Sequence, residues 1–202
     1  MNYQEIQQIV NLPNCKIVIG DSLKKYKVPI EKVLTTNEIL YYNQLNTIHK
    51  QNQFKIIRGL RTASLGLTEI KYKDYGAPYL IGQNTHISIS HKNNYVVFGY
   101  STFKIGIDLE LISEKVKNVK SKFLNEQELS DFSNESDEIY TKLWTAKEAI
   151  YKTMTPPISF KNDIKLSKDN NGVIIGKTFD NESIININFL NIKNYILCYV
   201  LI

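Results

Sequence analysis

The order of apolar and polar residues predicts short strands and amphipathic helices. Asn37 to Leu65 has apolar residues at helical spacing, and two more helices are expected over 116–132 and 137–154. Strands are expected near residues 16–21, 69–73, 86–90, 95–101, 105–110, 163–167, 172–177, 183–189 and 195–201. Helices grouped ahead of antiparallel strands are typical of the α+β fold class.

Four stretches of the first half recur in the second half in the same order. The pairs are KIVIGD with KIGIDLE, VLTTNEI with FLNEQEL, TEIKYKDYG with NDIKLSKDNNG, and KNNYVVFGY with KNYILCYV. The repetition predicts two similar α+β halves, residues 1–102 and 103–202. A pairing of these halves with pseudo-twofold symmetry would leave a cleft between them.

Composition and charge narrow the function classes. The 202 residues carry a net charge of +5, which suggests an anionic partner such as nucleic acid, a phosphorylated cofactor or an acidic protein. Nucleic acid is the weaker option because the chain has no arginine-rich tail. No secretory signal is expected at the start, and no apolar run reaches the ~18 residues of a membrane span. Cys15 and Cys198 are expected to be free buried thiols of a cytoplasmic protein.

The segment IGIDLE, residues 105–110, places two carboxylates on one face of a strand. Ile105, Ile107 and Leu109 would form the buried face, and Gly106, Asp108 and Glu110 the other. Unpaired carboxylates on a buried strand are costly, and a divalent cation would remove that cost. Oxygen ligands favour Mg²⁺ or Mn²⁺. The alternative is a strand end exposed to solvent with both acids paired to lysines. Gly106 would let a ligand approach the backbone.

Three other stretches have both a structural and a functional interpretation. In LWTAKEAIYK, Trp144, Glu148 and Lys152 lie four residues apart, and Glu148 and Lys152 could be a simple surface ion pair. In HISISH, His91 at a strand end could donate to a phosphate or be structural. Positive charge is densest over residues 50–74, where Arg58 and Arg61 share a helix face. That face could be solvated or could bind phosphate.

Together, YGAPYL, SISH, GIDLE, FLNEQE and LWTAKEAIYK resemble the 4′-phosphopantetheinyl transferases, over roughly residues 50 to 155. The resemblance is to the single-chain, two-half type that activates surfactin synthetase. It implies a holo-acyl-carrier-protein synthase activity. Such an enzyme transfers the 4′-phosphopantetheine group of coenzyme A to a serine of an apo acyl or peptidyl carrier protein and releases adenosine 3′,5′-bisphosphate.

The resemblance also implies roles for individual residues. The metal ligands would be Asp108, Glu110 and Glu148, and the catalytic residues Glu148, Lys152 and His91. The coenzyme A site would use Arg58, Lys50, Gly76, Pro78, Ser90, His91 and Lys152. Glu128 would match a further acidic residue of the family. The first half would serve the nucleotide and the second would carry the metal.

Two positions depart from the family pattern. Ala77 stands where a lysine of a Gly-Lys-Pro turn is expected, and Lys92 stands where a serine is usual. Both changes bear on coenzyme A affinity, so a non-catalytic coenzyme A or carrier-binding protein is an alternative. A Mg²⁺-dependent phosphoester hydrolase is another, and a nucleic-acid binder comes last. We expect a monomer, with no nucleic-acid or membrane partner.

Overall fold

The computed structural model describes residues 7–21, 28–155, 157–179 and 181–202, and divides into two compact units. Unit 1 comprises Met1–Phe103 and unit 2 comprises Lys104–Ile202. Each unit combines helices with antiparallel strands, which confirms the predicted α+β class. The pseudo-twofold packing of the halves stays a prediction. Within the described residues no helix has the length and apolar character to span a membrane.

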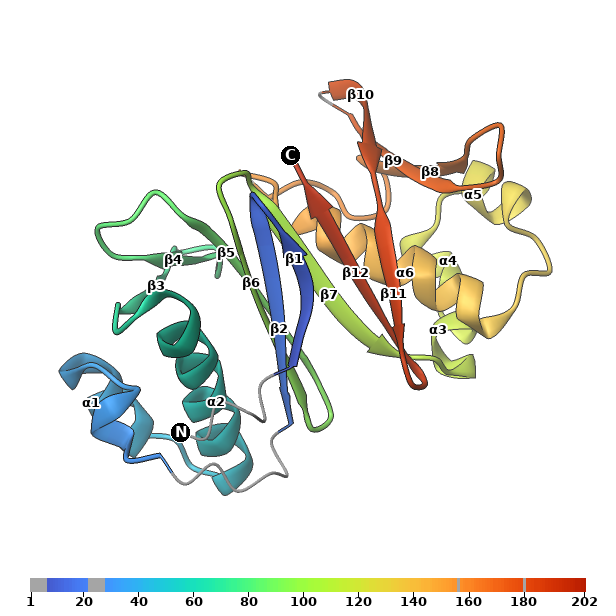
Figure 1. The fold of residues 1–202 in the computed structure, drawn as a ribbon. Helices are drawn as coiled ribbons and strands as arrows, with labels where there is room; N and C mark the ends of the chain where they lie inside the picture. The colour runs from blue at the N-terminus through green and yellow to red at the C-terminus, as the bar shows by residue number, and fades with distance from the viewer. Residues whose placement is uncertain (1–6, 22–27, 156, 180) are drawn as a thin grey trace. The chain divides into compact units, whose positions relative to one another are not determined.

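Unit 1 is built on a four-stranded sheet covered by a long helix (Figure 1). The strands are β1 (Gln7–Leu12), β2 (Cys15–Asp21), β5 (His86–Lys92) and β6 (Tyr95–Ser101), in the order β1-β2-β6-β5. Before the helix α2 (Ile48–Leu65) come the 3₁₀ helix η2 (Ile30–Lys32) and α1 (Thr36–Asn43). A short hairpin of β3 (Ile70–Tyr72) and β4 (Pro78–Leu80) follows α2. The apolar side of α2 packs on β2 and β6 through Ile57, Leu60, Val18 and Phe98.

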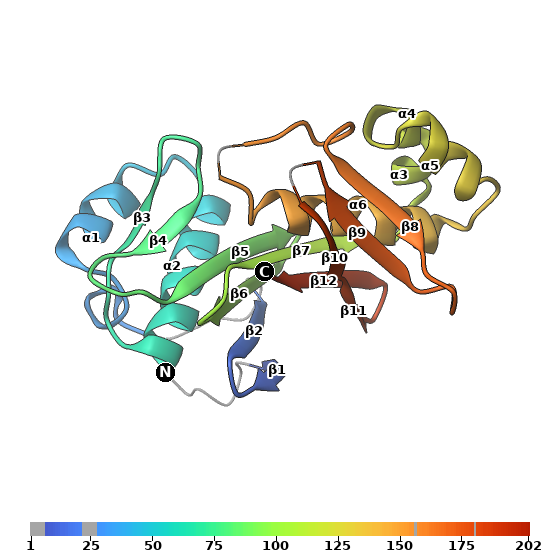
Figure 2. The same cartoon turned by 90° about the horizontal axis from the view of Figure 1, so that it is seen from above.

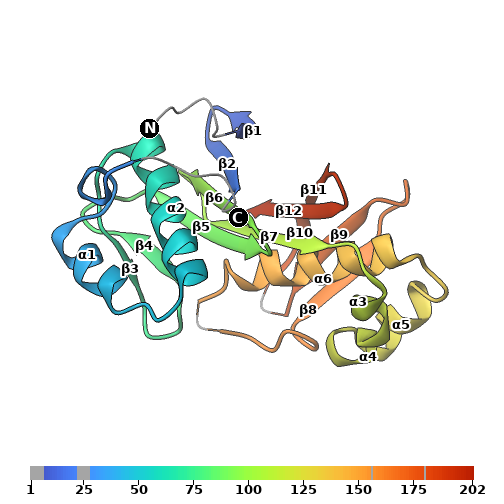
Figure 3. The ribbon, with the colours of Figure 1, turned by 90° about the horizontal axis from the view of Figure 1, so that it is seen from below.

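Unit 2 is built around helix α6 (Asp137–Tyr151), which packs on the strands β7 (Ile105–Leu111) and β12 (Tyr195–Leu201) (Figure 3). These strands form a sheet with β11 (Asn188–Ile192) in the order β11-β12-β7. A second sheet has the order β10-β9-β8 and consists of β8 (Ile164–Lys168), β9 (Ile174–Thr178) and β10 (Asn181–Asn186) (Figure 2). Three short helices precede α6: α3 (Glu114–Asn118), α4 (Lys120–Phe123) and α5 (Glu126–Asp131).

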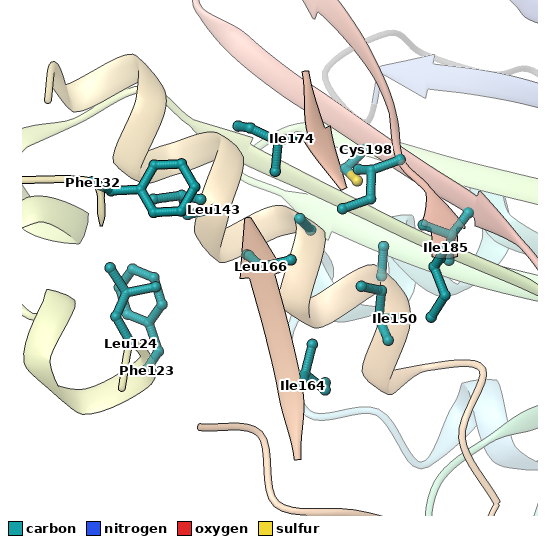
Figure 4. Close-up of a cluster of buried hydrophobic side chains, with 14 of the residues drawn as sticks. Phe123, Leu124, Phe132, Leu143, Ile150, Ile164, Leu166, Ile174, Ile185 and Cys198 are labelled. Atoms are coloured by element: carbon teal, nitrogen blue, oxygen red, sulfur yellow. The ribbon is translucent and has the colours of Figure 1, made fainter. Parts of the chain in front are cut away.

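The core of unit 2 holds α6 through its fully buried apolar side chains. Leu143, Ala146, Ala149 and Ile150 are fully buried in one cluster of apolar side chains. Figure 4 shows part of that cluster, with α6 between the β-strands and the short helices. Cys198 of β12 lies in the same cluster, and Cys15 in unit 1 is buried as well. Both thiols are free, as the sequence predicted.

A buried glutamate anchors the helices of unit 1 to the strand that follows them. Glu38 forms a capping box with Thr35 at the start of α1, and its Oε1 accepts a hydrogen bond from the Ile70 backbone N–H. Its Oε2 accepts from Arg61 Nη2 at 2.9 Å. Arg61 is fully buried and Glu38 is 4% exposed, so this carboxylate connects α1, α2 and β3.

Unit 2 contains the same arrangement at the corresponding place. Glu128 forms a capping box with Asn125 at the start of α5, and its Oε1 accepts from the Leu166 backbone N–H of β8. Its Oε2 accepts from Lys147 Nζ of α6 at 2.8 Å. Glu38 and Glu128 occupy matching positions of VLTTNEI and FLNEQEL, so the repeated letters correspond to a repeated buried ion pair.

Several predicted boundaries were wrong. The segment 116–132 is not one helix, because Leu124 adopts an extended backbone and Asn125 caps a new helix. The segment 37–65 divides likewise, because Thr47 caps α2. The strand expected over 183–189 is two strands, β10 and β11. Strands β1 and β4 were not predicted, since β1 is mostly exposed and carries little apolar alternation.

Replacing Lys147 with Met should destabilise the protein strongly, because Glu128 would stay buried without its charge partner. We expect the free energy of unfolding to fall by roughly 3–5 kcal/mol, measured by urea denaturation. Lys142→Met is the matched control, since Lys142 is on the same helix but pairs with Glu138 near the surface. That change should cost less than about 1 kcal/mol. Equal small losses would contradict a structural role for the buried pair.

Candidate active site

The face of β7 that carries the carboxylates is the face that α6 covers. In the register of the sheet, Gly106 is opposite Val200 and Asp108 is opposite Cys198. Val200 and Cys198 both lie in the core cluster with α6, and directly opposed residues of antiparallel strands point to the same side. Asp108 is 6% exposed, whereas Glu110 is only partly buried. This face therefore runs from beneath the helix out toward solvent.

Helix α6 brings two further charged groups to this face. The apolar positions Ala149 and Ile150 hold the helix in the core, so that Glu148 and Lys152 lie at its partly exposed C-terminal end. One turn earlier, the half-buried ring of Trp144 contacts Phe123 edge-on at 5.2 Å between centroids. Trp144, Glu148 and Lys152 therefore lie along one side of α6. Trp144 packs against apolar side chains, and Glu148 and Lys152 belong to the polar site.

Lys152 connects the helix to the strand. Its Nζ lies 2.9 Å from Asp108 Oδ1 and donates to the backbone carbonyl of Ile107 at 2.8 Å. The predicted alternative of a surface pair between Glu148 and Lys152 is therefore not the arrangement found, because the ammonium binds across to β7. The pairing of an acid of this strand with a lysine, which was the structural alternative for IGIDLE, does occur at Asp108.

The carboxylates of this site repel one another. Burial raises the pKa of Glu148 above its ordinary value, and the charges of Asp108 and Glu110 raise it further, while Lys152 opposes the shift. Asp108 also acts on Cys198 behind it, whose thiol pKa is raised well above its ordinary value, mainly by burial. Glu148, Asp108, Glu110 and Lys152 thus form one electrostatically coupled group.

The donor chemistry of this group fits a hard divalent cation. Three carboxylates supply only oxygen ligands, as Mg²⁺ and Mn²⁺ prefer, and their mutual repulsion is what a cation would relieve. They are not arranged as a finished metal site, because no group of three or more His, Cys, Asp or Glu side chains in the described residues is placed to hold a metal ion. Lys152 Nζ lies 2.9 Å from Asp108 Oδ1, so this ammonium and a metal ion would compete for that oxygen.

The expectation for Gly106 was wrong. We expected its missing side chain to admit a ligand, but the space above Gly106 is filled by the backbone of α6 at Ala149. A glycine in a strand marks the close approach either of a ligand or of another stretch of backbone, and the sequence looks the same in both cases. The sequence alone could not say which backbone or ligand approaches.

In unit 1, Arg58 is held by protein groups. Its Nε donates to Glu38 Oε1 at 3.2 Å, its guanidinium lies 3.7 Å from the centre of the Phe54 ring, and the residue is 3% exposed. Neither interpretation of the basic helix face foresaw this, because Glu38 comes from a separate helix. The role of Arg58 at the nucleotide stays a prediction. Lys50 is exposed in the first turn of α2.

The remaining predicted coenzyme A residues lie on other elements of unit 1. Gly76 turns between β3 and β4 with φ of 86°, a backbone conformation that glycine adopts readily, and Pro78 begins β4. Ser90 and His91 lie near the end of β5, with Ser90 buried and His91 exposed. The structure thus brings together the predicted residues of unit 2, while those of unit 1 are spread over α2, the hairpin and β5.

Sequence reasoning missed Lys147. It directly precedes Glu148, is fully buried, and donates to Glu128 and to the backbone carbonyl of Ile164. An apolar residue would ordinarily occupy such a position on a helix. The signal was the repeat itself, since Arg61 occupies the equivalent anchor of unit 1.

Comparisons with known proteins agree on one family. The family model of the 4′-phosphopantetheinyl transferase superfamily matches residues 104–200. The chain is 33% identical over 112 residues to 4′-phosphopantetheinyl transferase gsp of Aneurinibacillus migulanus, covering 52% of this chain and 46% of that protein. It is 25% identical over 119 residues to 4′-phosphopantetheinyl transferase Sfp of Bacillus subtilis (strain 168), covering 54% and 53%.

The chain spans about half the length of the curated relatives it matches. Among solved structures it is similar to a holo-ACP-synthase from Plasmodium yoelii, with a TM-score of 0.38 and 24% identity over 59% of this chain and 96% of that one. The family match covers the whole of β7 and α6, and with them Asp108, Glu110, Glu148 and Lys152. Residues 104–200 are therefore similar to the 4′-phosphopantetheinyl transferase superfamily.

Proposed function

We propose that the protein transfers the 4′-phosphopantetheine group of coenzyme A to a serine of an apo carrier protein. One observation carries the proposal: Asp108, Glu148 and Lys152 meet where the C-terminal end of α6 crosses β7, inside the region that matches the family. Asp108 precedes Glu148 by 40 residues in the sequence, so the fold and not local sequence brings the strand and helix groups together.

The reaction breaks one phosphoanhydride bond. The serine Oγ of the carrier attacks the phosphorus that bears the pantetheine arm, and a new P–O bond forms. The bond from this phosphorus to the bridging oxygen breaks, and adenosine 3′,5′-bisphosphate leaves with that electron pair. The serine proton must go to a base at the same time, so the product is a phosphodiester on the carrier and no oxidant or reductant is required.

Glu148 is the proposed base for the serine proton. It is partly exposed, and α6, on which it lies, is anchored through the neighbouring Lys147. A positioned base contributes about 10²–10⁴-fold to the rate of such a step. Lys152 Nζ lies beside Asp108, and it would turn to the pyrophosphate when coenzyme A binds and neutralise charge on the substrate.

Asp108, Glu110 and Glu148 are the proposed ligands of Mg²⁺, with Mn²⁺ as an alternative. Such a cation, when bound, neutralises the pyrophosphate and the charge developing on the leaving bisphosphate. Asp108 and Glu110 are held at fixed spacing by the strand, and Glu148 faces them from the helix. Lys152 would exchange its contact with Asp108 for one with phosphate as these groups fill.

Unit 1 is the proposed nucleotide side. The exposed residues His91, Lys50 and Gly76 would contact coenzyme A, with Ser90 and Pro78 shaping the same surface and Arg58 at its phosphate end. Ala77 offers no charge where the family pattern has a lysine, and Lys92 on β5 would partly replace that charge. The net charge of +5 suits both coenzyme A and an acidic carrier. We further propose a cytoplasmic monomer that does not bind nucleic acid.

The direct test is the mass of the carrier. The protein is mixed with coenzyme A, Mg²⁺ and a panel of apo acyl and peptidyl carrier proteins. The proposal predicts that a carrier gains one phosphopantetheine group on its serine, and that a chelator prevents the gain. Release of adenosine 3′,5′-bisphosphate without a carrier would favour a hydrolase, and tight coenzyme A binding without turnover would favour a binding protein.

Glu148→Gln should lower the turnover number by at least about 10²-fold, because the amide cannot accept the serine proton. The fold should survive, since the replacement is isosteric and Glu148 is partly exposed. The control is Glu138→Gln in the first turn of the same helix. Glu138 pairs with Lys142 near the surface, and its replacement should change turnover little. Similar rates for wild type and Glu148→Gln would exclude Glu148 as the base.

His91→Ala should raise the KM for coenzyme A by about tenfold, the loss expected for one hydrogen bond to a charged phosphate. Turnover at saturating coenzyme A should change less. His86→Ala is the matched control, because His86 is also exposed on β5 but lies an odd number of residues away, on the other face of the strand. Equal KM values for the two variants would remove His91 from the nucleotide site.

A further inference from the structure

The close approach of α6 to β7 depends on the absence of a side chain at Gly106. A methyl group built on Gly106 would overlap the carbonyl oxygen of Ala149 and lie 2.8 Å from its carbonyl carbon. It would also lie 2.9 Å from Thr153 Cγ2. The obstacle is helix backbone, which cannot rotate away as a side chain can. Only glycine at this position lets the helix rest directly on the strand.

This contact lies beside the proposed active-site groups. Glu148 directly precedes Ala149 in the helix, and Lys152 follows it by less than one turn. On the strand, Asp108 is the next residue on the same face as Gly106. The separation of helix and strand at Gly106 therefore sets how far Glu148 and Lys152 are from Asp108, and Lys152 Nζ now lies 2.9 Å from Asp108 Oδ1.

The first unit provides an internal comparison. In the repeat, Val18 of β2 stands where β7 has Gly106, and Gly20 stands where β7 has Asp108. Val18 packs its side chain under α2 against Ile57 and Leu60. Strand β2, which has no carboxylate at the position of Asp108, thus contacts α2 through the side chain of Val18. Strand β7, which carries Asp108, contacts α6 directly through its backbone.

We propose that Gly106 is a positioning residue for phosphopantetheinyl transfer, which sets the distance between the groups of α6 and Asp108. The inference rests on the proposed function and adds a residue that touches neither substrate nor metal. A displacement of about 1 Å of reacting groups can cost about 10²-fold in rate. Gly106→Ala has to displace the helix, since a methyl cannot share the space of the Ala149 carbonyl.

Gly176→Ala is the matched control. Gly176 is a buried strand glycine of the same unit that also packs on α6, but a methyl there would meet the flexible end of a side chain, Ile150 Cδ1, at 2.6 Å. The two variants add the same methyl group against the same helix. They differ in whether the helix backbone or one rotatable methyl group has to move.

Three quantities are measured on wild type and both variants: transfer to a carrier, Mn²⁺ affinity without substrates by electron paramagnetic resonance, and the Lys152 Nζ to Asp108 Oδ1 distance in crystals. For Gly106→Ala we expect at least a tenfold fall in turnover, weaker Mn²⁺ binding and a longer distance. Gly176→Ala should stay near wild type in all three. Wild-type turnover and Mn²⁺ affinity in Gly106→Ala would overturn the positioning role.

Failure of the proposed function gives a different result. If wild type transfers to no carrier, the function is wrong, and Mn²⁺ affinity together with the crystal distance still tests whether Gly106 sets the geometry. If Gly106→Ala does not fold, Thr153→Ile enlarges from the helix side the side chain that lies next to Gly106, and the flexible end of the isoleucine can adjust. A smaller loss of turnover and of Mn²⁺ affinity is then expected, and no change in either would overturn the inference.

Discussion

The contact between the backbones of α6 and β7 is the constraint on which the candidate site depends. Gly106 and Ala149 meet without an intervening side chain, so groups on the following turn of the helix reach groups further along the strand. The apolar positions of α6 fix its rotation through the core (Figure 4), and the buried pair of Lys147 and Glu128 fixes its position along its axis. Glu148 and Lys152 then have little freedom in where they lie relative to Asp108.

The two units show how one framework can carry chemistry in one copy only. Both contain the buried anchor of a capping glutamate, a cation of the long helix and a backbone N–H of the next strand. Arg61 and Lys147 are equivalent in these anchors, so the next residues, Thr62 and Glu148, correspond as well. In the repeated strand, Gly20 aligns with Asp108. The Thr62 hydroxyl donates to the Val33 carbonyl, so Thr62 has a structural role. Unit 1 therefore retains the framework without the carboxylates.

The local pattern of apolar and polar residues predicted most of the long strands and helices. Alternation identified β5, β6, β7 and β12, and helical spacing identified α2 and α6. It could not divide 116–132 into three helices, because the break depends on the extended backbone at Leu124 and a cap at Asn125, which look helical by spacing alone. Short exposed strands such as β1 carry no buried face and hence no pattern.

At the site, sequence reasoning named the charged residues but not their partners. The structural alternative for Lys152 was a pair with Glu148 along its own helix, but Lys152 binds across to Asp108. For Arg58 the sequence offered a solvated face or a phosphate site, and neither included its stacking on Phe54 or its bond to Glu38. The partners of Lys152 and Arg58 depend on which segments the fold brings together. The spacing of apolar residues along the chain does not contain that information. The family resemblance supplied the grouping of Asp108, Glu110 and Glu148 that spacing alone left open.

The measurement that tests the account most directly is the position of Mn²⁺ in crystals grown with the ion and coenzyme A, located by its anomalous scattering. The account predicts an ion at about 2.0–2.3 Å from carboxylate oxygens of Asp108 and Glu148, with Lys152 Nζ withdrawn from Asp108 Oδ1 toward a phosphate. Coenzyme A bound with no ion at these carboxylates, and with the Lys152–Asp108 contact intact, would contradict it.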